Sequence, residues 1–449
     1  MGRLFGTDGA RGVANTELTC ELAMQIGRAA ATVLTRHTSE KPMLLIGRDT
    51  RISSKMLEAA LVAGICSVGA DVTSIGVIPT PAVAYLVGKY KADAGIMISA
   101  SHNPVEFNGI KIFNNEGFKL SDEIENEIEE LILDHPEQIE LKSGIELGRM
   151  FSRRSAVNDY VKHIASTIDG DLSGMRVAVD CANGSASTTA ELLFKGLGAV
   201  PLIIHAEPDG TNINDNCGST HMDSLIAFMK RHNCQVGVAF DGDADRCLAV
   251  DEHGEIVDGD KMIAIFAKDM HDRGVLVNDT AVVTVMTNLG FFHFTKAEGI
   301  NTVATKVGDR YVLEEMRANG HIIGGEQSGH IIFSQHASTG DGQLSAVKLL
   351  HIMKESEQTL SSLSSVMERF PQVLVNVKAD SEAKARYAQD QEIAALIEQV
   401  GNDLGDNGRI LVRPSGTEPI VRVMIEGKNL EEIQQLADSV AKAIEERIH

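Results

Sequence analysis

The chain has 449 residues, a formal net charge of −22, 43% hydrophobic residues and 23% charged residues. It is too long for one hydrophobic core, so we expect three or four domains. The negative charge argues against nucleic-acid and anionic-membrane partners, because both need a basic protein surface. No apolar run is long enough to span a membrane, and the first residues lack the apolar core of a signal peptide, so the sequence predicts a cytoplasmic protein.

The first 150 residues alternate apolar strands with helical stretches. The pattern predicts strands at 43–47, 71–79 and 94–100 and helices at 53–69 and 121–133, with Ser121 as the cap of the last helix. It recurs with a strand and turn at 175–187, strands at 200–210 and 235–245, and a helix at 223–234, and a third, loosely similar α/β block over about 256–368 contains the segments 281–288, 301–309 and 321–330. Such alternation is typical of mostly parallel sheets flanked by helices.

The last eighty residues follow a different pattern. They contain three expected strands and two long expected helices: strands at 373–379, 409–416 and 421–428, helices at 383–400 and 430–448. This order predicts a compact α+β domain.

The segment DGDADR, residues 241–246, lies between two apolar runs that read as strands. Asp241, Asp243 and Asp245 stand at alternate positions, so they can share one side of an extended segment and converge on a hard cation, Mg²⁺ or Ca²⁺. The same spacing opens a helix–loop–helix calcium site, but Arg246 stands where that loop needs Gly. A solvated acidic turn is the plainer alternative.

Three further segments carry groups suited to phosphate and sugar chemistry. Ser101 and His102 lie in SASHNP, a loop after a predicted strand, where α/β folds place ligand and catalytic groups. Ten residues on, Lys111 lies between two isoleucines and could either extend to solvent or reach a site. GGEQSGH (324–330) offers Glu and Ser for hydroxyl groups, and RPSGTEP (413–419) with Arg422 resembles an anion cradle. Taken singly, each could be a structural turn.

In this order, SASHNP, DGDADR, GEQSGH and RPSGTEP resemble the four signature loops of the phosphohexomutases, one from each of four domains. The segments 5–12, 208–219 and 306–312 look most like the bacterial members acting on glucosamine phosphate. Phosphomannomutases and phosphoglucomutases typically carry Pro and His in the second of these segments, where this chain has Asn212, Asn214, Asn216 and Cys217.

The resemblance implies an α/β fold of three similar mixed-sheet α/β domains and a smaller α+β C-terminal domain, with the active site in the central cleft. The implied domains are a phosphoserine-loop domain (1–153), a metal-binding domain (154–255), a sugar-binding domain (256–369) and a phosphate-binding C-terminal domain (370–449). We also expect the C-terminal domain to close on bound ligand, because water would hydrolyse the phosphorylated species.

The implied reaction interconverts glucosamine 6-phosphate and glucosamine 1-phosphate through a phosphorylated Ser101 and glucosamine 1,6-bisphosphate, and supplies amino-sugar nucleotide and cell-wall precursor synthesis. One Mg²⁺ per site would be held by Ser101, Asp241, Asp243 and Asp245. The implied catalytic residues are Ser101, His102, Lys111, Arg11 and His330. The implied substrate contacts are Gly308, Asp309, Glu326, Ser328, Arg413, Ser415, Gly416, Thr417 and Arg422.

Alternatives remain at this level. The same chemistry on glucose or mannose phosphates is the nearest, and a Mg²⁺-dependent sugar phosphatase or a non-catalytic sugar-phosphate sensor are the others. The resemblance suggests a homodimer, although no hydrophobic stripe in the sequence indicates one. A kinase, self-phosphorylation or the bisphosphate could each phosphorylate Ser101 first.

Overall fold

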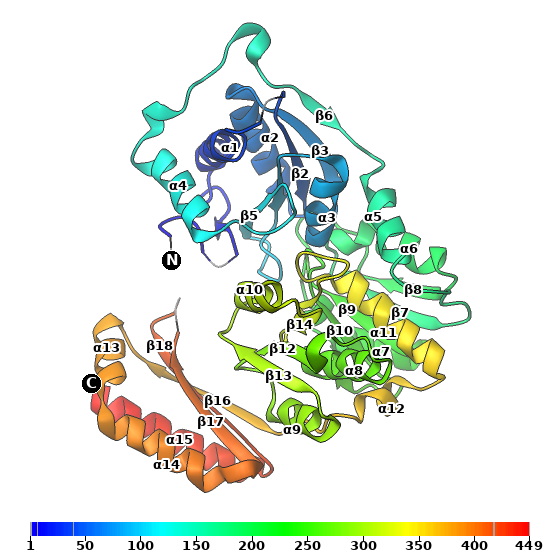
Figure 1. The fold of residues 1–449 in the computed structure, drawn as a ribbon, viewed down its shortest axis with the longest axis vertical. Coiled ribbons are helices and arrows are strands. Elements are labelled where there is room, and N and C mark those ends of the chain that lie inside the picture. The colour runs from blue at the N-terminus through cyan, green and yellow to red at the C-terminus, as the bar shows by residue number, and fades with distance from the viewer. Residues whose placement is uncertain (1, 7, 39, 416–417, 449) are drawn as a thin grey trace. The chain divides into compact units, whose positions relative to one another are not determined.

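The computed structural model describes residues 2–6, 8–38, 40–415 and 418–448. Four sheets follow one another along the chain, and the ribbon in Figure 1 passes through them from blue to red. The first three sheets each combine parallel and antiparallel pairs, whereas the fourth is a three-stranded antiparallel sheet. The predicted class, three mixed α/β domains followed by a smaller α+β domain, is confirmed.

The first sheet has the strand order β1-β5-β4-β2-β3-β6. Its central strands are buried apolar runs, and the paired helices α1 and α2 pack into the same core (Figure 1). Ser121 lies at the N-cap position of α4, as predicted, but its hydroxyl caps none of the backbone N–H groups of that helix described here. The elements are β1 (Ala10–Val13), α1 (Cys20–Leu34), β2 (Met43–Arg48), α2 (Ser54–Ser67), β3 (Asp71–Val77), α3 (Thr80–Tyr90), β4 (Ala94–Ile98), β5 (Phe107–Asn114), α4 (Asp122–Leu133) and β6 (Met150–Ser152).

The second sheet has the order β11-β10-β9-β7-β8, and the third β13-β12-β14-β15. β14 ends at Gly325, and the predicted Gly-rich loop forms a tight turn that leads into β15. The elements are α5 (Ala156–Ala165), β7 (Arg176–Asp180), α6 (Ala190–Gly196), β8 (Val200–Ile204), α7 (Asp223–His232), β9 (Val236–Phe240), β10 (Cys247–Val250), β11 (Ile256–Val257), α8 (Gly259–Asp272), β12 (Thr280–Thr284), β13 (Asn301–Thr305), α10 (Asp309–Asn319), β14 (Ile323–Gly325), β15 (Ile331–Phe333), α11 (Gly342–Ser356) and α12 (Leu360–Ser364).

The fourth sheet, with the order β16-β18-β17, belongs to a separate compact unit. This unit comprises Thr287–Glu298 and Met367–His449, and the other comprises Met1–Met286 and Gly299–Val366. Helix α9 falls in the C-terminal unit, where Asn288 donates to the Phe370 carbonyl and to Glu426. The elements are α9 (Leu289–Glu298), β16 (Gln372–Lys378), α13 (Ser381–Gln389), α14 (Gln391–Leu404), β17 (Gly408–Pro414), β18 (Ile420–Gly427) and α15 (Leu430–Ile448).

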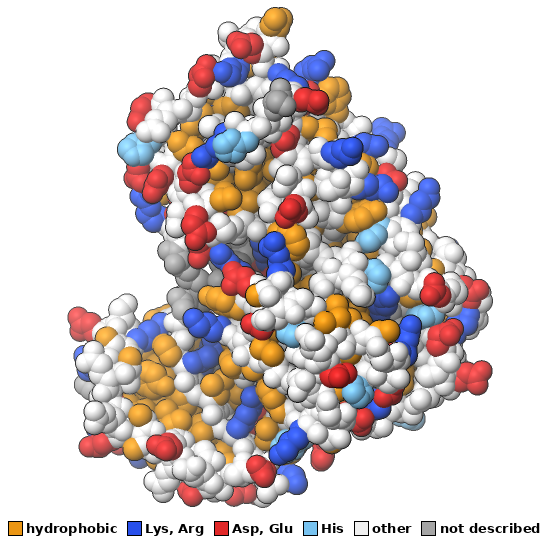
Figure 2. Space-filling model, in the orientation of Figure 1, with side chains coloured by type: hydrophobic (Ala, Val, Ile, Leu, Met, Phe, Trp, Pro, Cys, Tyr) orange, Lys and Arg blue, Asp and Glu red, His pale blue; other side chains and the backbone are white. Residues whose placement is uncertain are grey.

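The prediction of one helix over 383–400 is wrong. The segment forms two helices, α13 and α14, because Asp390 between them adopts an extended conformation and its carboxylate accepts hydrogen bonds from Glu392 N and Ile393 N. A side chain that caps a new helix in this way competes with continuation of the old one. Figure 2 shows apolar side chains gathered on the visible face of this unit, whose core is bordered by partly buried Val375, Leu396, Ile397, Ile410 and Val412.

None of the helices within the described residues combines the length and the apolar composition needed to cross a membrane.

Candidate active site

Ser101 lies in the loop between β4 and β5, with only 1% of its surface exposed. Its hydroxyl donates to Asp241 Oδ2 at 2.5 Å and lies 3.3 Å from His102 Nδ1. The loop therefore brings the predicted nucleophile to the first carboxylate of the acidic segment, although the two residues are 140 positions apart in sequence.

The acidic segment forms the turn between β9 and β10. Each of Asp241, Asp243 and Asp245 offers a carboxylate oxygen within 4.8 Å of the other two, and all three side chains are buried. Thr80 Oγ1 donates to Asp243 Oδ2 at 2.6 Å, and Arg246 N donates to Asp241 Oδ1 at 3.2 Å. These bonds fix the orientation of the carboxylates toward a common point.

The surrounding cations compensate the three carboxylates unequally: burial alone would raise the pKa of Asp245, but Lys111 and His330 outweigh it and lower that pKa, whereas Asp241 is not compensated in this way. Burial raises the pKa of Asp241 well above its ordinary value, and the neighbouring Asp245 and Asp243 raise it further. Asp243 Oδ1 and Asp245 Oδ1 are buried and have no hydrogen-bond partner among the described residues. Buried oxygens without partners are costly, and a divalent cation would satisfy them and offset the repulsion. The site therefore fits a hard metal ion such as Mg²⁺.

A second group of possible ligands, Asp180, His205 and Cys217, lies in the same segment of the chain. Here the carboxylate is already satisfied: Asp180 Oδ1 accepts from Ala182 N at 2.8 Å, and Oδ2 interacts with His205 Nδ1 at 2.9 Å and accepts from Gly218 N at 3.0 Å. Both oxygens of the Asp180 carboxylate therefore already have hydrogen-bond partners, so this group gains little from binding a metal ion.

Lys111 and Arg11 lie on adjacent antiparallel strands, β5 and β1. The Lys111 ammonium donates to Asp243 Oδ2 at 2.8 Å and lies 3.3 Å from Asp8 Oδ2. Burial alone would lower the pKa of Lys111, but Asp243, Asp8 and Asp245 outweigh it and raise that pKa. Lys111 is therefore a fixed cation. Of the two alternatives predicted for it, extension to solvent is wrong, because only 1% of the residue is exposed.

His102 and Arg246 face each other across the site, with Arg246 NH1 3.0 Å from His102 Nδ1. Burial lowers the pKa of His102 to about 4, and the cations Arg246 and Arg11 contribute to the same direction. The ring is therefore neutral near pH 7, and with Nδ1 accepting from the guanidinium, Nε2 carries the proton.

His330 ends the turn between β14 and β15 and is 2% exposed. Its Nδ1 lies 3.6 Å from Asp245 Oδ2, and its Nε2 lies 3.4 Å from Asp309 Oδ2 and accepts from Gly340 N at 3.0 Å. Burial opposes the charged ring, but Asp245 and Asp309 raise the pKa of His330. This histidine thus connects the acidic segment with the start of α10.

Glu326 and Ser328 lie in the same turn as His330. Glu326 Oε1 accepts from Gly308 N at 3.1 Å, and burial raises the pKa of Glu326. The buried Ser328 Oγ has no hydrogen-bond partner within the part of the chain that the structure describes. The predicted hydroxyl-binding pair and Gly308 are therefore neighbours, and one of the pair is free to bond a ligand.

Two residues without a predicted role complete the charge network. Lys119 donates to Asp8 Oδ1 at 2.7 Å and to Asp309 Oδ2 at 2.6 Å. Asp8 lies within the segment 5–12 that carries part of the family resemblance, but Lys119, which forms a β-bridge with Phe113, carries no sequence signal of its own. Only the fold reveals that these groups connect the predicted Arg11, Lys111 and Asp309.

The predicted phosphate cradle lies in the C-terminal unit. Arg413 on β17 and Arg422 on β18 are direct partners in the antiparallel register. Burial lowers the pKa of Arg413, and the charge of Arg422 lowers it further. Arg422 pairs with Glu418, yet its buried Nε has no hydrogen-bond partner among the residues described. Like charges in cross-strand contact are destabilising, so an anion between them is favourable.

Ser415 follows Arg413 in the same loop, and its Oγ accepts from Glu418 N at 3.1 Å. Lys384, which was not predicted, donates to the carbonyl oxygens of Ser415 and Glu418, each at 2.6 Å. The remaining predicted members, Gly416 and Thr417, lie outside the described residues.

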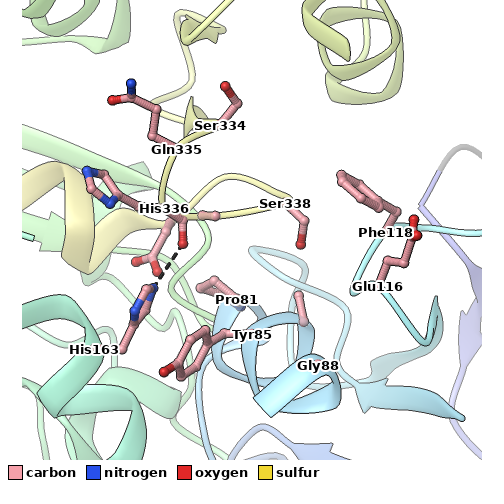
Figure 3. Close-up of a pocket in the computed structure, with 13 residues that line it drawn as sticks. Pro81, Tyr85, Gly88, Glu116, Phe118, His163, Ser334, Gln335, His336 and Ser338 are labelled. Atoms are coloured by element: carbon pink, nitrogen blue, oxygen red, sulfur yellow. Dashed lines mark hydrogen bonds between the residues drawn. The ribbon is translucent and has the colours of Figure 1, made fainter. Parts of the chain in front are cut away.

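A separate pocket of about 270 Å³ is lined by α3, α5 and the segment 334–338. Figure 3 shows Tyr85 beside His163, whose rings stack at 3.8 Å, and a hydrogen bond from His163 to the backbone of His336. None of the predicted site residues lines this pocket. It is therefore distinct from the candidate active site.

Family models of phosphoglucomutase/phosphomannomutase match nearly the whole chain. The matched parts are alpha/beta/alpha domain I at residues 2–138, domain II at 158–254, domain III at 258–370 and the C-terminal domain at 374–443.

Solved structures agree with this assignment at the level of fold. A phosphoglucomutase/phosphomannomutase family protein from Burkholderia thailandensis has a TM-score of 0.83 at 23% identity, with 99% of this chain and 98% of that chain covered. The N-acetylphosphoglucosamine mutase of Aspergillus fumigatus, solved in complex with GlcNAc-6P and magnesium, has a TM-score of 0.70 at 17% identity, with 100% and 96% covered.

Curated relatives are much closer in sequence. The phosphoglucosamine mutase of Acetivibrio thermocellus is 55% identical over 448 residues, covering 100% of both chains. That of Clostridium novyi is 54% identical over 447 residues, covering 100% of this chain and 99% of the relative. With full-length identity of this extent and all four domain types matched in order, the chain belongs to the phosphoglucosamine mutase family of the phosphohexomutases.

Proposed function

We propose that the chain interconverts glucosamine 6-phosphate and glucosamine 1-phosphate through a phosphorylated Ser101 and glucosamine 1,6-bisphosphate. The observation that carries this proposal is the buried Ser101 hydroxyl, 2.5 Å from Asp241 in a group of carboxylates that retains unpartnered oxygens among the described residues. Asp241, Asp243, Asp245 and a phosphoserine oxygen would hold one Mg²⁺. When bound, the ion would neutralise charge on the transferring phosphoryl group.

The first transfer starts from phosphorylated Ser101. The O1 hydroxyl of glucosamine 6-phosphate forms a bond to phosphorus and loses its proton, while the bond between phosphorus and Ser101 Oγ breaks and Oγ takes up a proton. The product is the 1,6-bisphosphate. Lys111 and Arg11 supply fixed positive charge, because the raised pKa of Lys111 keeps its ammonium protonated.

The second transfer requires the bisphosphate to turn over. Ser101 Oγ then bonds to phosphorus of the 6-phosphate and loses its proton, while the bond from phosphorus to O6 breaks and O6 takes up a proton. The phosphate at the opposite end would bind Arg413, Ser415, Gly416, Thr417 and Arg422 in either orientation, because paired guanidinium groups bind phosphate rather than sugar. Glu326, Ser328, Gly308 and Asp309 would contact the sugar.

Proton transfer is assigned to the imidazoles. His102 Nδ1 lies 3.3 Å from Ser101 Oγ, and we assign it as the acceptor of the serine proton, a role that requires Nδ1 to exchange its contact with Arg246 for one with the serine. His330 accepts from Gly340 N through Nε2, so its ring proton lies on Nδ1, toward Asp245, and we assign this N–H as the proton donor. These roles follow from the contacts of each ring with groups of known charge.

The division of labour along the chain is also a proposal. The segments 1–153, 154–255, 256–369 and 370–449 would supply the phosphoserine loop, the metal ligands, the sugar contacts and the phosphate cradle. The separate family matches support four segments in this order. A homodimer and phosphorylation of Ser101 by a kinase stay predictions.

Phosphorus NMR tests the reaction. The purified protein receives Mg²⁺, a trace of glucosamine 1,6-bisphosphate and, separately, glucosamine 6-phosphate, glucose 6-phosphate or mannose 6-phosphate. We expect the 1-phosphate signal to grow fastest from the glucosamine ester and to be absent with Ser101→Ala. Faster turnover of a neutral hexose would retain the mechanism and change the substrate. Release of inorganic phosphate alone would replace the mutase proposal with a phosphatase.

A further inference from the structure

Ser101 has a backbone conformation that a serine rarely adopts. Its φ is +52°, in the left-handed region that favours glycine. Such a conformation is strained for a residue with a Cβ and persists only where the surroundings enforce it. The groups that enforce it therefore control where the hydroxyl points.

Two side chains from different parts of the sequence hold the Ser101 carbonyl oxygen. Arg51 NH2 donates to it at 3.0 Å, and Asn214 Nδ2 donates to it at 2.9 Å. The same two groups also donate to Asn103 O, at 2.8 Å and 3.3 Å, and Arg51 NH1 donates to Pro104 O. The backbone of the whole SASHNP turn is thus fixed from both sides.

Arg51 is itself held in place by a buried carboxylate. Asp49, which is fully buried, accepts from Arg51 Nε at 2.8 Å and from Ser99 Oγ at 2.7 Å. Ser99 Oγ in turn accepts from Ser101 N at 3.0 Å. One carboxylate therefore organises the partners of both backbone groups of Ser101, its N–H through Ser99 and its C=O through Arg51.

Asn214 reaches the turn from the segment 208–219. Its own backbone is anchored by a hydrogen bond from Asn214 N to Ala182 O at 2.9 Å. Gly242 packs closely against both residues: a Cβ at this position would lie 2.6 Å from Ser101 O and 2.9 Å from Asn214 Nδ2. The acidic turn, the serine turn and this asparagine thus form one tightly packed contact.

We propose that Arg51 and Asn214 are positioning residues that hold Ser101 in its left-handed conformation and keep Oγ directed at the metal site. The proposal rests on the proposed function for its catalytic consequence, but the conformational claim stands on the contacts alone. It also explains what the asparagine-rich segment contributes, because an amide from the metal-binding part of the chain holds the serine turn.

The structure offers a matched control for Asn214. Asn216 lies two residues away with a similar φ, +50° against +58°, and its side chain bonds only to the exposed Asp215 among the described residues. Replacement of either residue by Gly removes an amide without straining the backbone. Both variants lose one side-chain amide, but only Asn214→Gly loses the hydrogen bond to the Ser101 carbonyl oxygen.

We expect Asn214→Gly to lower kcat on the order of 10-fold to 100-fold, because a small displacement of a nucleophile has effects of this size. KM should stay within about threefold of wild type, since no substrate contact is removed. Asn216→Gly should leave both constants near the wild-type values. Arg51→Lys keeps a charge beside Asp49 but loses the planar fork, and should lower kcat in the same manner.

Hydrogen exchange tests the conformational claim without using activity. Peptides that cover residues 99–105 should exchange at least about tenfold faster in Asn214→Gly than in Asn216→Gly or wild type. Unchanged exchange together with an unchanged kcat would overturn the proposal. If the wild type shows no mutase activity, the proposed function fails, while faster exchange in Asn214→Gly would still support the positioning role.

Discussion

The second mixed sheet presents two clusters of possible metal ligands, and only one of them is built for an ion. In the Asp241, Asp243 and Asp245 cluster, like charges converge and two buried oxygens have no partner among the described residues. In the cluster around Asp180, a single carboxylate meets two backbone N–H groups and an imidazole. Both clusters bring possible ligand atoms close together, but only the Asp241, Asp243 and Asp245 cluster combines like charges with buried oxygens that lack partners among the described residues.

The comparison shows how to distinguish a binding site from a structural cluster. A group that has its hydrogen bonds gains little from a ligand, and its removal lowers stability. A group that lacks them gains from a ligand and is costly without one. The two clusters should therefore respond in opposite ways to the same substitutions.

The largest expected difference is in activity. Asp243→Asn removes a charge from the metal site, and we expect kcat to fall at least about 10³-fold, the size seen when a preorganised charge at a reaction centre is lost. Asp180→Asn, with the same change of atoms, should keep kcat within about tenfold. Steady-state kinetics with saturating Mg²⁺ measures both. An equal fall in kcat for the two variants would contradict the distinction between a metal site and a structural cluster.

The next difference is in stabilisation by metal. At a Mg²⁺ concentration of about 100 times Kd, the free energy of unfolding of wild type should rise by about 2.7 kcal/mol. The same rise is expected for Asp180→Asn and none for Asp243→Asn. Urea denaturation with Mg²⁺ and with a chelator provides the values, and a rise that survives Asp243→Asn would place the ion elsewhere.

In metal-free protein the two clusters should respond with opposite signs. Asp241→Asn removes one of three converging charges, so the free energy of unfolding should rise by about 1 kcal/mol. Asp180→Ala leaves buried donors unpaired and should lower it by about 2 kcal/mol. Denaturation in a chelating buffer measures both. A loss of stability in Asp241→Asn would show that the hydrogen bonds of that carboxylate outweigh the repulsion.

The smallest expected effect is on pH dependence. The hydrogen bond to Asp180 raises the pKa of His205, although partial burial opposes this. A raised pKa of a base stabilises the fold below the unfolded value, and this contribution is lost as the pH rises through the folded value. The difference in unfolding free energy between wild type and His205→Asn should thus be larger at about pH 5.5 than at about pH 8.5. A difference that grew with pH would contradict the assignment.

The local parts of the site could be predicted from the sequence. Alternate carboxylates after an apolar strand, a serine at a strand end and a Gly-rich turn with Glu, Ser and His are patterns of short segments. Alternation fixes side-chain direction only in extended segments, whereas residues 241–246 form a turn with Ala244 at a φ of +57°, so the three carboxylates converge through the turn rather than along a strand. The α/β character of the first part and the α+β character of the last eighty residues likewise followed from strand and helix alternation.

The connections between these parts could not be predicted in the same way. Lys119 reaches Asp8 and Asp309, which are 111 and 190 positions away, and Arg246 meets His102 across 144 positions. Such pairs depend on how segments distant in sequence pack in the folded chain, which no short pattern encodes. The break at Asp390 was missed for a local reason: an apolar period continued through it, and the capping preference of the carboxylate prevailed.

The left-handed backbone at Ser101 also restricts which residue type could serve as the proposed phosphate acceptor at this position. Threonine would supply the same hydroxyl chemistry, but its branched Cβ makes a φ near +50° a genuine outlier. In a Ser101→Thr protein, either the φ angle of residue 101 or the direction of its hydroxyl oxygen would have to change. The identity of the proposed nucleophile is thus set by the shape of the main chain as much as by the reactivity of the side chain, and between serine and threonine this backbone favours serine.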